Sequence, residues 1–188
     1  QFLPLSGQVS APDPGFVPDV PAVKKLFSDV HGAAHWSQKA VDYVVDRGLF
    51  TGTDEHTFSP DANATRSTIV TVLWRLDGAP VSEKGNEGVF SDVPANTWYT
   101  ESVKWAASNS IVTGFEDSSF QPDAFITREQ LACILWRYAK NKGQDVSVGE
   151  DTNILSYTDA FDISDYAFPA LQWACGAGVM NGRGEDLL

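Results

Sequence analysis

Two arginines, Arg66 and Arg128, each come directly after a threonine at the predicted start of an apolar helix. The start of a helix carries unpaired backbone amides and the positive end of the helix dipole. A cation there is unfavourable by about 0.3–1 kcal/mol unless a negative group offsets it. Free amides and a guanidinium fork together form a receptor for a carboxylate or a phosphate. The residues predicted to bind an anionic ligand are Arg66 and Arg128.

An internal salt bridge is the alternative for both helix-start arginines. An aspartate stands five residues before each of them, at Asp61 and at Asp123. The two interpretations do not exclude each other. A second pair of arginines, Arg75 and Arg137, is predicted to lie in the last turns of helices, where a cation is favourable. We interpret this second pair as structural.

Tryptophans offer a second kind of binding chemistry, because an indole face stacks well on a sugar ring. The six tryptophans form three pairs at equivalent places in the chain: Trp36 with Trp98, Trp74 with Trp136, and Trp105 with Trp173. The alternative is packing in the core, which we favour for Trp105 and Trp173 because both lie within a predicted helix. Trp36 and Trp98 lie where a loop meets a helix, and both interpretations stay open for them.

The sequence does not predict catalysis or a metal centre. Paired acids, Asp54-Glu55 and Glu116-Asp117, are the residue types of a glycosidase, but they are adjacent in turn-rich loops and no single acid stands apart from the repeats. The three histidines all fall in one segment, and no segment alternates acids as a calcium loop does. The two cysteines, Cys133 and Cys175, are predicted to be buried free thiols rather than a disulfide.

The candidate residues are positioned by an internal repeat. One segment begins at Phe27 and another at Phe90, both with the sequence FSDV. After a gap of one residue, the two align at a fixed offset of 62 positions, as between Trp36 and Trp98. Further equivalent pairs are Gly52 and Gly114, Phe58 and Phe120, Thr65 and Thr127, and Leu73 and Leu135. Similarity at a long fixed period is typical of a repeat architecture.

A third copy begins at Tyr157, with Tyr166 in the place of Trp98 and Gly182 in the place of Gly114. It reaches Leu188 at the place of Phe120, so we expect a truncated repeat without its own Thr-Arg pair. The expected division is an extended proline-rich leader (1–26), repeat 1 (27–76), a linker (77–89), repeat 2 (90–138), a linker (139–156) and repeat 3 (157–188).

Each complete repeat is predicted to be a helix, a loop and a second helix. In repeat 2, Val103, Ala106, Ala107 and Ser110 mark one helical face, and Leu131, Ile134, Leu135 and Tyr138 mark another. Thr127-Arg-Glu-Gln130 fits a capping box, Gly48 is a plausible left-handed stop, and Phe58 is expected to plug the core. Such a unit cannot bury both apolar faces alone, but stacked units can.

The net charge of the 188-residue chain is −12, and its isoelectric point is near 4.4. A polyanion such as a nucleic acid is repelled by this charge at long range, and so is an anionic membrane surface. No apolar run approaches the ~18 residues of a membrane-spanning helix. We therefore expect neither a nucleic-acid partner nor membrane insertion.

The order of these features resembles the S-layer homology family. The features that carry the resemblance are, in order, FSDV, a tryptophan, an Ala/Val-rich helix, a glycine turn, Phe-x-Pro-Asp, and Thr-Arg before an apolar helix. Thr65-Arg-Ser-Thr68 and Thr127-Arg-Glu-Gln130 correspond to the Thr-Arg-Ala-Glu signature of the family, although repeat 1 has Ser-Thr in place of Ala-Glu. The resemblance covers residues 27–188.

The resemblance implies an all-α fold of three repeats in a pseudo-threefold helical spindle. It also implies inter-repeat grooves that bind a secondary cell-wall polysaccharide attached to peptidoglycan and bearing a pyruvate ketal, whose carboxylate meets the signature arginine. The implied glycan-binding residues are Arg66, Arg128, Thr65 and Thr127, with Trp98 and Tyr166 from the following repeats as stacking residues.

The predicted function is non-covalent anchoring at the extracellular face of a bacterial cell wall, with no catalytic residue, no metal and no cofactor. The truncated third repeat predicts self-association, or completion by the leader around 16–26. The alternative function is a protein–protein assembly module that uses the same grooves.

Overall fold

The computed structural model describes residues 27–30, 35–81, 90–148, 152–183 and 187–188. Its elements are the α-helices α1 (Gln38–Asp46), α2 (Arg66–Leu76), α3 (Thr100–Ser108), α4 (Arg128–Asn141) and α5 (Phe168–Gly176), with the short 3₁₀ helices η1 (Ile154–Ser156) and η2 (Ala160–Asp162) between α4 and α5. Within these ranges there is no strand, only an isolated bridge between Thr65 and Phe125. The predicted all-α class is confirmed. The expected leader lies outside the described residues.

The second helix of each complete repeat begins where the sequence predicts. Thr65 and Thr127 are extended N-cap residues, and their hydroxyl oxygens accept hydrogen bonds from the backbone N–H groups of Thr68 and Gln130. The capping box is confirmed, because the Gln130 side chain accepts from the Thr127 N–H in return. At the end of α1, Gly48 adopts a left-handed φ of 65°, as expected of a helix stop.

Two boundaries differ from the prediction. Helix α3 ends at Ser108, and Ser110 has a φ of 57°, so Ser110 belongs to the following turn rather than to the helical face. Helix α4 continues to Asn141, which lies inside the expected linker, so Arg137 stands before the last turn of its helix. Arg75 does lie in the last turn of α2. Cys133 and Cys175 are both free thiols.

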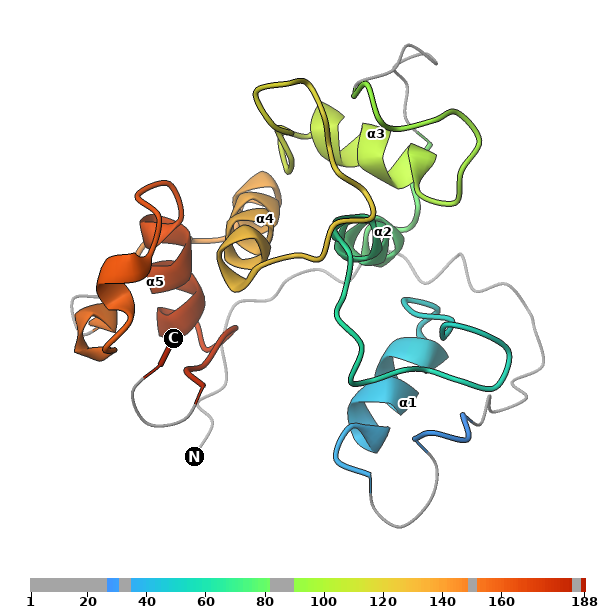
Figure 1. Ribbon diagram of the computed structural model, residues 1–188, viewed down its shortest axis with the longest axis horizontal. Coiled ribbons are helices and arrows are strands. Elements are labelled where there is room, and N and C mark those ends of the chain that lie inside the picture. The colour runs from blue at the N-terminus through green and yellow to red at the C-terminus, as the bar shows by residue number, and fades with distance from the viewer. Residues whose placement is uncertain (1–26, 31–34, 82–89, 149–151, 184–186) are drawn as a thin grey trace.

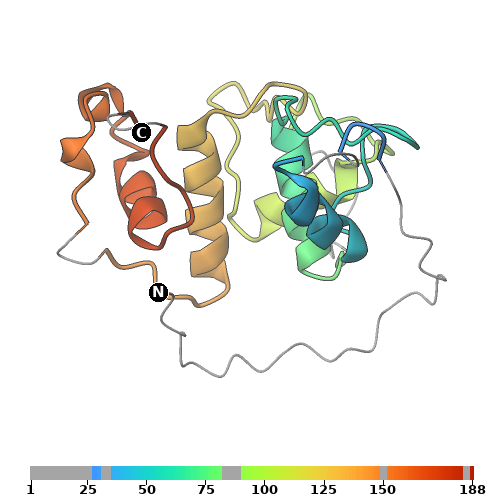
Figure 2. The ribbon, with the colours of Figure 1, turned by 90° about the horizontal axis from the view of Figure 1, so that it is seen from below.

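The repeats are joined by packing the second helix of one against the first helix of the next. Helix α2 packs on α3, and α4 packs on α5 (Figure 1). Figure 2 shows α4 standing between α5 on one side and the α1–α3 part on the other. The two larger core clusters follow this scheme, since one combines Val70 and Leu73 of α2 with repeat 2 and the other combines Ala132 and Cys133 of α4 with repeat 3. Trp105 and Trp173 are buried in these clusters, as expected.

An aspartate closes the loop of every repeat. The carboxylate of Asp29 accepts from the backbone N–H groups of Phe58 and Ser59. Asp92 accepts in the same way from Phe120 and Gln121, and Asp159 accepts from Leu188. Leu188 is buried and takes the position of the two phenylalanine plugs, in keeping with the predicted alignment of repeat 3.

A glycine and an aromatic ring lock each loop in place. A Cβ atom on Gly52 would lie 2.4 Å from Phe27, and one on Gly114 would lie 2.3 Å from Phe90. On Gly182 it would lie 2.5 Å from Tyr157. Only glycine admits this close approach, which explains why the glycine and the aromatic residue recur together in all three copies.

Self-association through repeat 3 stays a prediction. In the described ranges, no helix is both long and apolar enough to cross a membrane.

Candidate functional site

The start of α2 is hydrogen-bonded to the loop of repeat 2. The N–H of Arg66 donates to the carbonyl oxygen of Ala124 at 3.0 Å, and the N–H of Ser67 donates to that of Pro122 at 3.0 Å. The Ser67 hydroxyl donates to the same Pro122 oxygen. The helix-start amides expected to receive an anion are therefore already used inside the protein. The prediction of free amides at Arg66 is wrong, because the backbone of a neighbouring repeat supplies the acceptors.

The side chain of Arg66 is held by the same neighbour. Its Nε donates to the carbonyl oxygen of Phe120 at 2.8 Å, and its Nη1 donates to Oε1 of Gln130 at 3.2 Å. The guanidinium carbon lies 4.8 Å from the ring centres of Phe115 and Phe120, and the residue is only 7% exposed. Within the described residues, Arg66 forms no ion pair with Asp61, so the structure favours carbonyl and aromatic partners over the salt-bridge alternative.

Arg128 is the counterpart of Arg66 in repeat 2, and its side chain contacts repeat 3. Its Nη2 donates to the carbonyl oxygen of Asn181, whereas its buried Nε has no partner among the described residues. Arg128 lines a pocket of 210 Å³ together with three carboxylates, those of Glu129, Asp159 and Asp162. Such surroundings oppose the binding of an anionic group. Like Arg66, Arg128 forms no described ion pair with its predicted aspartate.

Thr65 and Thr127 serve as helix caps, and neither lines the pocket beside Arg66, its counterpart in repeat 1 or the pocket of Arg128. Gln130 connects the cap to the site, since its Oε1 accepts from the Thr127 N–H at 3.5 Å and from Nη1 of Arg66 at 3.2 Å. The two threonines therefore position the arginines rather than face a ligand.

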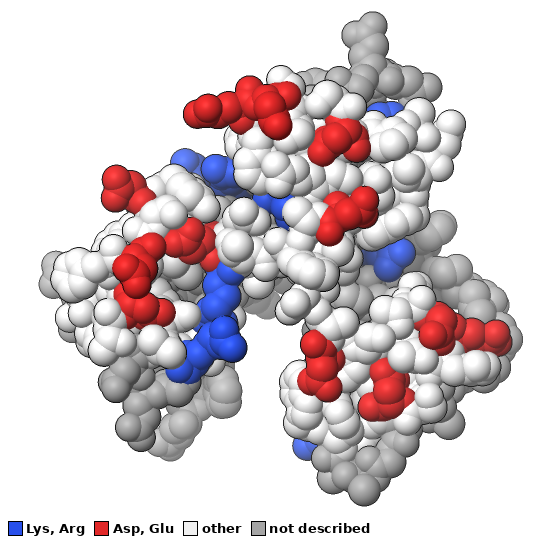
Figure 3. Space-filling model, viewed as in Figure 1, with Lys and Arg blue, Asp and Glu red and all other residues white. Residues whose placement is uncertain are grey.

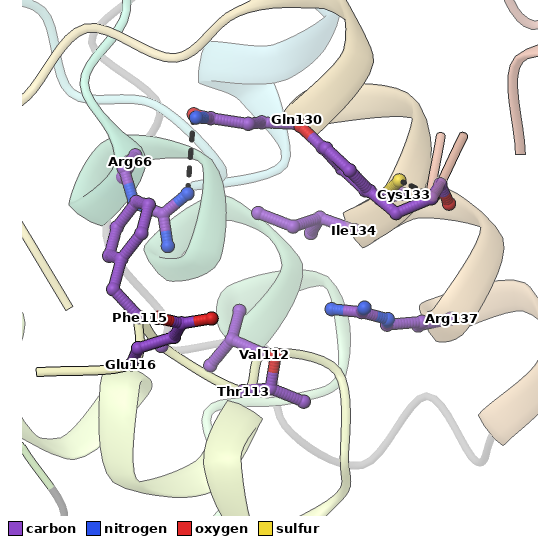
Figure 4. A pocket seen from close by; sticks show the side chains of 11 residues that line it. Arg66, Val112, Thr113, Phe115, Glu116, Gln130, Cys133, Ile134 and Arg137 are labelled. Atoms are coloured by element: carbon purple, nitrogen blue, oxygen red, sulfur yellow. Dashed lines mark hydrogen bonds between the residues drawn. The ribbon is translucent and has the colours of Figure 1, made fainter. Parts of the chain in front are cut away.

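The pocket beside Arg66 is built from three repeats, and we call it the Tyr166 pocket. Its volume is 350 Å³. Figure 4 shows the side chains that line it. Repeat 1 supplies Arg66 and repeat 3 supplies Tyr166, while repeat 2 supplies the rest of the lining: Val112, Thr113, Gly114, Phe115, Glu116, Gln130, Cys133, Ile134 and Arg137. In Figure 4, Arg66 and Arg137 lie at opposite sides of the pocket, with Gln130 and Ile134 on the wall formed by α4.

A second, larger pocket is the repeat-1 counterpart of the first, and we call it the Trp98 pocket. Its volume is 570 Å³. Each of several lining residues has its counterpart in the Tyr166 pocket: Thr51 and Thr113, Gly52 and Gly114, Thr68 and Gln130, Thr71 and Cys133, Val72 and Ile134, Arg75 and Arg137, and Trp98 and Tyr166. The described chain thus carries the same kind of pocket twice.

The pockets pair the predicted residues differently from the expectation. Arg66 shares a pocket with Tyr166, two repeats further on, while Trp98 shares one with Arg75. Trp98 and Tyr166 are 61% and 60% exposed, so their rings are open to a ligand. Sequence reasoning missed Arg75 and Arg137 as pocket residues. The signal that could indicate them is the recurrence of Leu-Trp-Arg in both complete repeats. A position near the end of a helix already accounts for a cation, so this recurrence alone does not point to a pocket.

Tyr166 is fixed by Glu129. The Glu129 carboxylate accepts from the N–H of Ser164 at 2.8 Å, from its hydroxyl at 3.0 Å, and from the Tyr166 hydroxyl at 3.4 Å. Burial and the nearby Glu129 carboxylate raise the pKa of Tyr166 above its ordinary value. Its phenol is therefore a neutral hydrogen-bonding group at neutral pH, with a ring held at the mouth of the pocket.

The electrostatics of the Tyr166 pocket favour an anion. Burial lowers the pKa of Arg66, Tyr166 and Asp92 oppose this effect, and the charge of Arg137 lowers the pKa further. Arg66 and Arg137 carry like charges and line the same pocket, so their guanidinium groups repel one another. Glu116 is the one acid in the lining, and it is exposed. Figure 3 shows Lys and Arg atoms between the part that carries α5 and the part that carries α3, with Asp and Glu atoms scattered over the rest of that face. A local positive site thus exists on a chain of net charge −12.

The fold and these pockets define a helical repeat module with pockets between its repeats. Residues 26–68 and 89–132 match the family model of the S-layer homology domain. The chain belongs to the S-layer homology family, whose repeats act as cell-surface anchoring modules.

Several known proteins contain a similar segment. The endoglucanase of Bacillus sp. (strain KSM-635) is 31% identical over 157 residues, which are 84% of this chain and 16% of that enzyme. S-layer protein EA1 of Bacillus anthracis is 29% identical over 64% of this chain and 14% of its own length. A cellulosome-anchoring protein of Acetivibrio thermocellus is 26% identical over 70% of this chain and 30% of its own. The chain spans less than a third of each of these relatives.

Proposed function

We propose that this chain anchors the protein that carries it at the extracellular face of a bacterial cell wall, by binding an anionic secondary cell-wall polysaccharide between its repeats. The observation that carries the proposal is the Tyr166 pocket, where two guanidinium groups and an exposed aromatic ring share one cavity. A carboxylate on a sugar, such as a pyruvate ketal, matches this combination. The charged group meets the arginines and the sugar face lies against the ring.

The names of the relatives support anchoring rather than catalysis. An S-layer protein, a cellulosome-anchoring protein and an endoglucanase carry names of three different kinds, yet all three contain a segment like this chain. A segment shared by proteins of such different kinds is explained more simply by a common role in surface anchoring than by a common catalytic centre. We accordingly assign no catalytic residue to the chain.

The test is co-sedimentation with three preparations of one bacterial cell wall that carries a pyruvylated secondary polymer. The first preparation is intact, the second has lost the ketal through mild acid, and the third has lost the whole polymer through hydrofluoric acid. We expect strong retention on the first and at least a tenfold weaker one on the other two. Equal retention on all three would contradict glycan binding and would favour a protein–protein assembly module.

A further inference from the structure

The arginines of the two pockets differ in how firmly the protein already holds them. Arg66 is 7% exposed and gives two of its guanidinium nitrogens to Phe120 and Gln130. Arg75 gives one nitrogen to the carbonyl oxygen of Leu49 at 3.0 Å. The half-buried Arg137 makes no hydrogen bond or ion pair in the part of the chain that the structure describes. The guanidinium of Arg137 is thus the uncommitted cation of the Tyr166 pocket.

Helix α4 gives Arg137 a fixed base. Arg137 lies one turn beyond Cys133 and Ile134, and all three line the pocket from one side of the helix. Figure 4 shows the Arg137 side chain entering the pocket from the side opposite Arg66. Because α4 continues to Asn141, Arg137 does not neutralise the last carbonyl groups of the helix, which was the structural role expected from the sequence.

The second pocket repeats this arrangement without Arg66. Arg75 and Trp98 line it together, just as Arg137 and Tyr166 line the first. What the two pockets have in common is therefore an arginine from the second helix and an aromatic ring from the next repeat. Of these two equivalent pockets, the Tyr166 pocket alone contains a helix-start arginine, Arg66, which is buried there, while Arg128 lines the separate pocket of 210 Å³.

We propose that Arg137 is the residue that receives the anionic group of the ligand in the Tyr166 pocket, and that Arg66 is a positioning residue that holds the pocket together. This inference rests on the proposed function. A carboxylate between the two guanidinium groups relieves their mutual repulsion, and it pairs with Arg137, which is exposed more than Arg66 and uses none of its donors within the described residues. The sugar that carries the carboxylate then lies against Tyr166, whose hydroxyl is already tied to Glu129.

The test uses a methyl hexoside that carries a pyruvate ketal as the probe, with its methyl ester as the neutral counterpart. Calorimetry measures the affinity of the wild-type chain and of Arg137→Gln, Arg137→Lys, Arg66→Gln and Arg47→Gln, and a melting curve accompanies each. Arg47→Gln is the matched control, because it changes the net charge equally on an exposed side chain that lines no described pocket.

We expect Arg137→Gln to weaken binding of the acid by about ten- to a hundred-fold, the range of a charge-assisted hydrogen bond, with an unchanged melting temperature. Arg137→Lys should recover part of the loss, and the ester should bind wild type and Arg137→Gln alike. Arg66→Gln should lower the melting temperature as well as the affinity. Arg47→Gln should match the wild type in both measurements.

Two results would overturn the role of Arg137. One is an acid affinity in Arg137→Gln equal to that of the wild type, and the other is a fall in its melting temperature as large as that of Arg66→Gln. A wild-type chain that binds acid and ester equally would instead contradict the proposed function, since no anionic group would then be recognised.

Discussion

Nε of Arg66 donates to the carbonyl oxygen of Phe120 at 2.8 Å, so a residue of repeat 1 is fixed by the plug residue of repeat 2. Replacing Arg66 by alanine removes this bond, the bond to Gln130, and the contacts with two aromatic rings. We expect the free energy of unfolding to fall by about 2–4 kcal/mol, because buried acceptors lose a charged donor. Urea unfolding at pH 7 measures the change.

The control for this variant is Arg47→Ala. Arg47 is exposed, and its guanidinium lies 3.6 Å from the centre of the Tyr43 ring on the same helix surface. Its loss should change the free energy of unfolding by no more than about 0.5 kcal/mol. Equal stability of the Arg66→Ala and Arg47→Ala proteins would show that the contacts of Arg66 with repeat 2 contribute little to the free energy of unfolding.

A comparison of Gly114 with Gly143 distinguishes the cost of steric crowding from the cost of a left-handed backbone. A Cβ atom on Gly114 would lie 2.3 Å from Phe90 and 2.7 Å from the Ser119 carbonyl oxygen, at a φ of 70°. At Gly143 the φ is 68°, but nothing lies within 4 Å. Gly143→Ala should therefore cost about 1 kcal/mol from its left-handed backbone alone, and Gly114→Ala about 3 kcal/mol or more. Thermal and urea unfolding of the two variants checks this difference, and similar losses would contradict the ring-locked loop.

Stability should depend on acid through Asp29. The backbone N–H of Phe58 holds the pKa of this carboxyl below its ordinary value of 3.8. Because the folded-state pKa is depressed, the interaction stabilises the fold above the unfolded pKa, and this contribution is lost as the pH falls through the folded value. Asp29→Asn should be less stable than the wild type at pH 7 and should lose less on acidification below about pH 4. Urea unfolding between pH 7 and pH 2.5 measures both.

Asp61→Asn is the control for the acid series. Asp61 is exposed, and its carboxylate makes no hydrogen bond within the described residues. Its variant should keep the pH dependence of the wild type. A curve for Asp29→Asn that runs parallel to the wild-type curve down to pH 2.5 would exclude Asp29 as a contributor to acid sensitivity.

Much of the local structure could be predicted from the sequence, because it depends on signals inside one repeat. The N-caps at Thr65 and Thr127, the capping box with Gln130 and the left-handed turn at Gly48 are all confirmed. Each depends on residues at most a few positions apart. The burial of Trp105 could be predicted for the same reason, since its place on a helix face follows from periodicity.

The relations between repeats could not be predicted in this way. The Ala124 and Pro122 carbonyl groups that take the helix-start amides lie in another repeat, and nothing in the pattern of repeat 1 indicates them. The same limit explains why Arg66 was not paired with Tyr166, 100 positions away in the chain. Stacking geometry decides which repeats meet at a pocket, and periodicity within one repeat carries no information on it.

Trp98 and Tyr166 provide the last prediction, because they are the exposed aromatic members of equivalent pockets. If each ring packs on a sugar, removing it exposes roughly 40–50 Å² of apolar contact, worth about 1 kcal/mol or a fivefold loss of affinity. Trp98→Ala and Tyr166→Ala should each show this loss against wall-polymer fragments in calorimetry, and their melting temperatures should change little. Trp105→Ala should behave in the opposite way and lose about 3–5 kcal/mol of stability, since Trp105 is 5% exposed in the core. Full affinity in the Trp98→Ala, Tyr166→Ala double variant would rule out stacking as a source of binding.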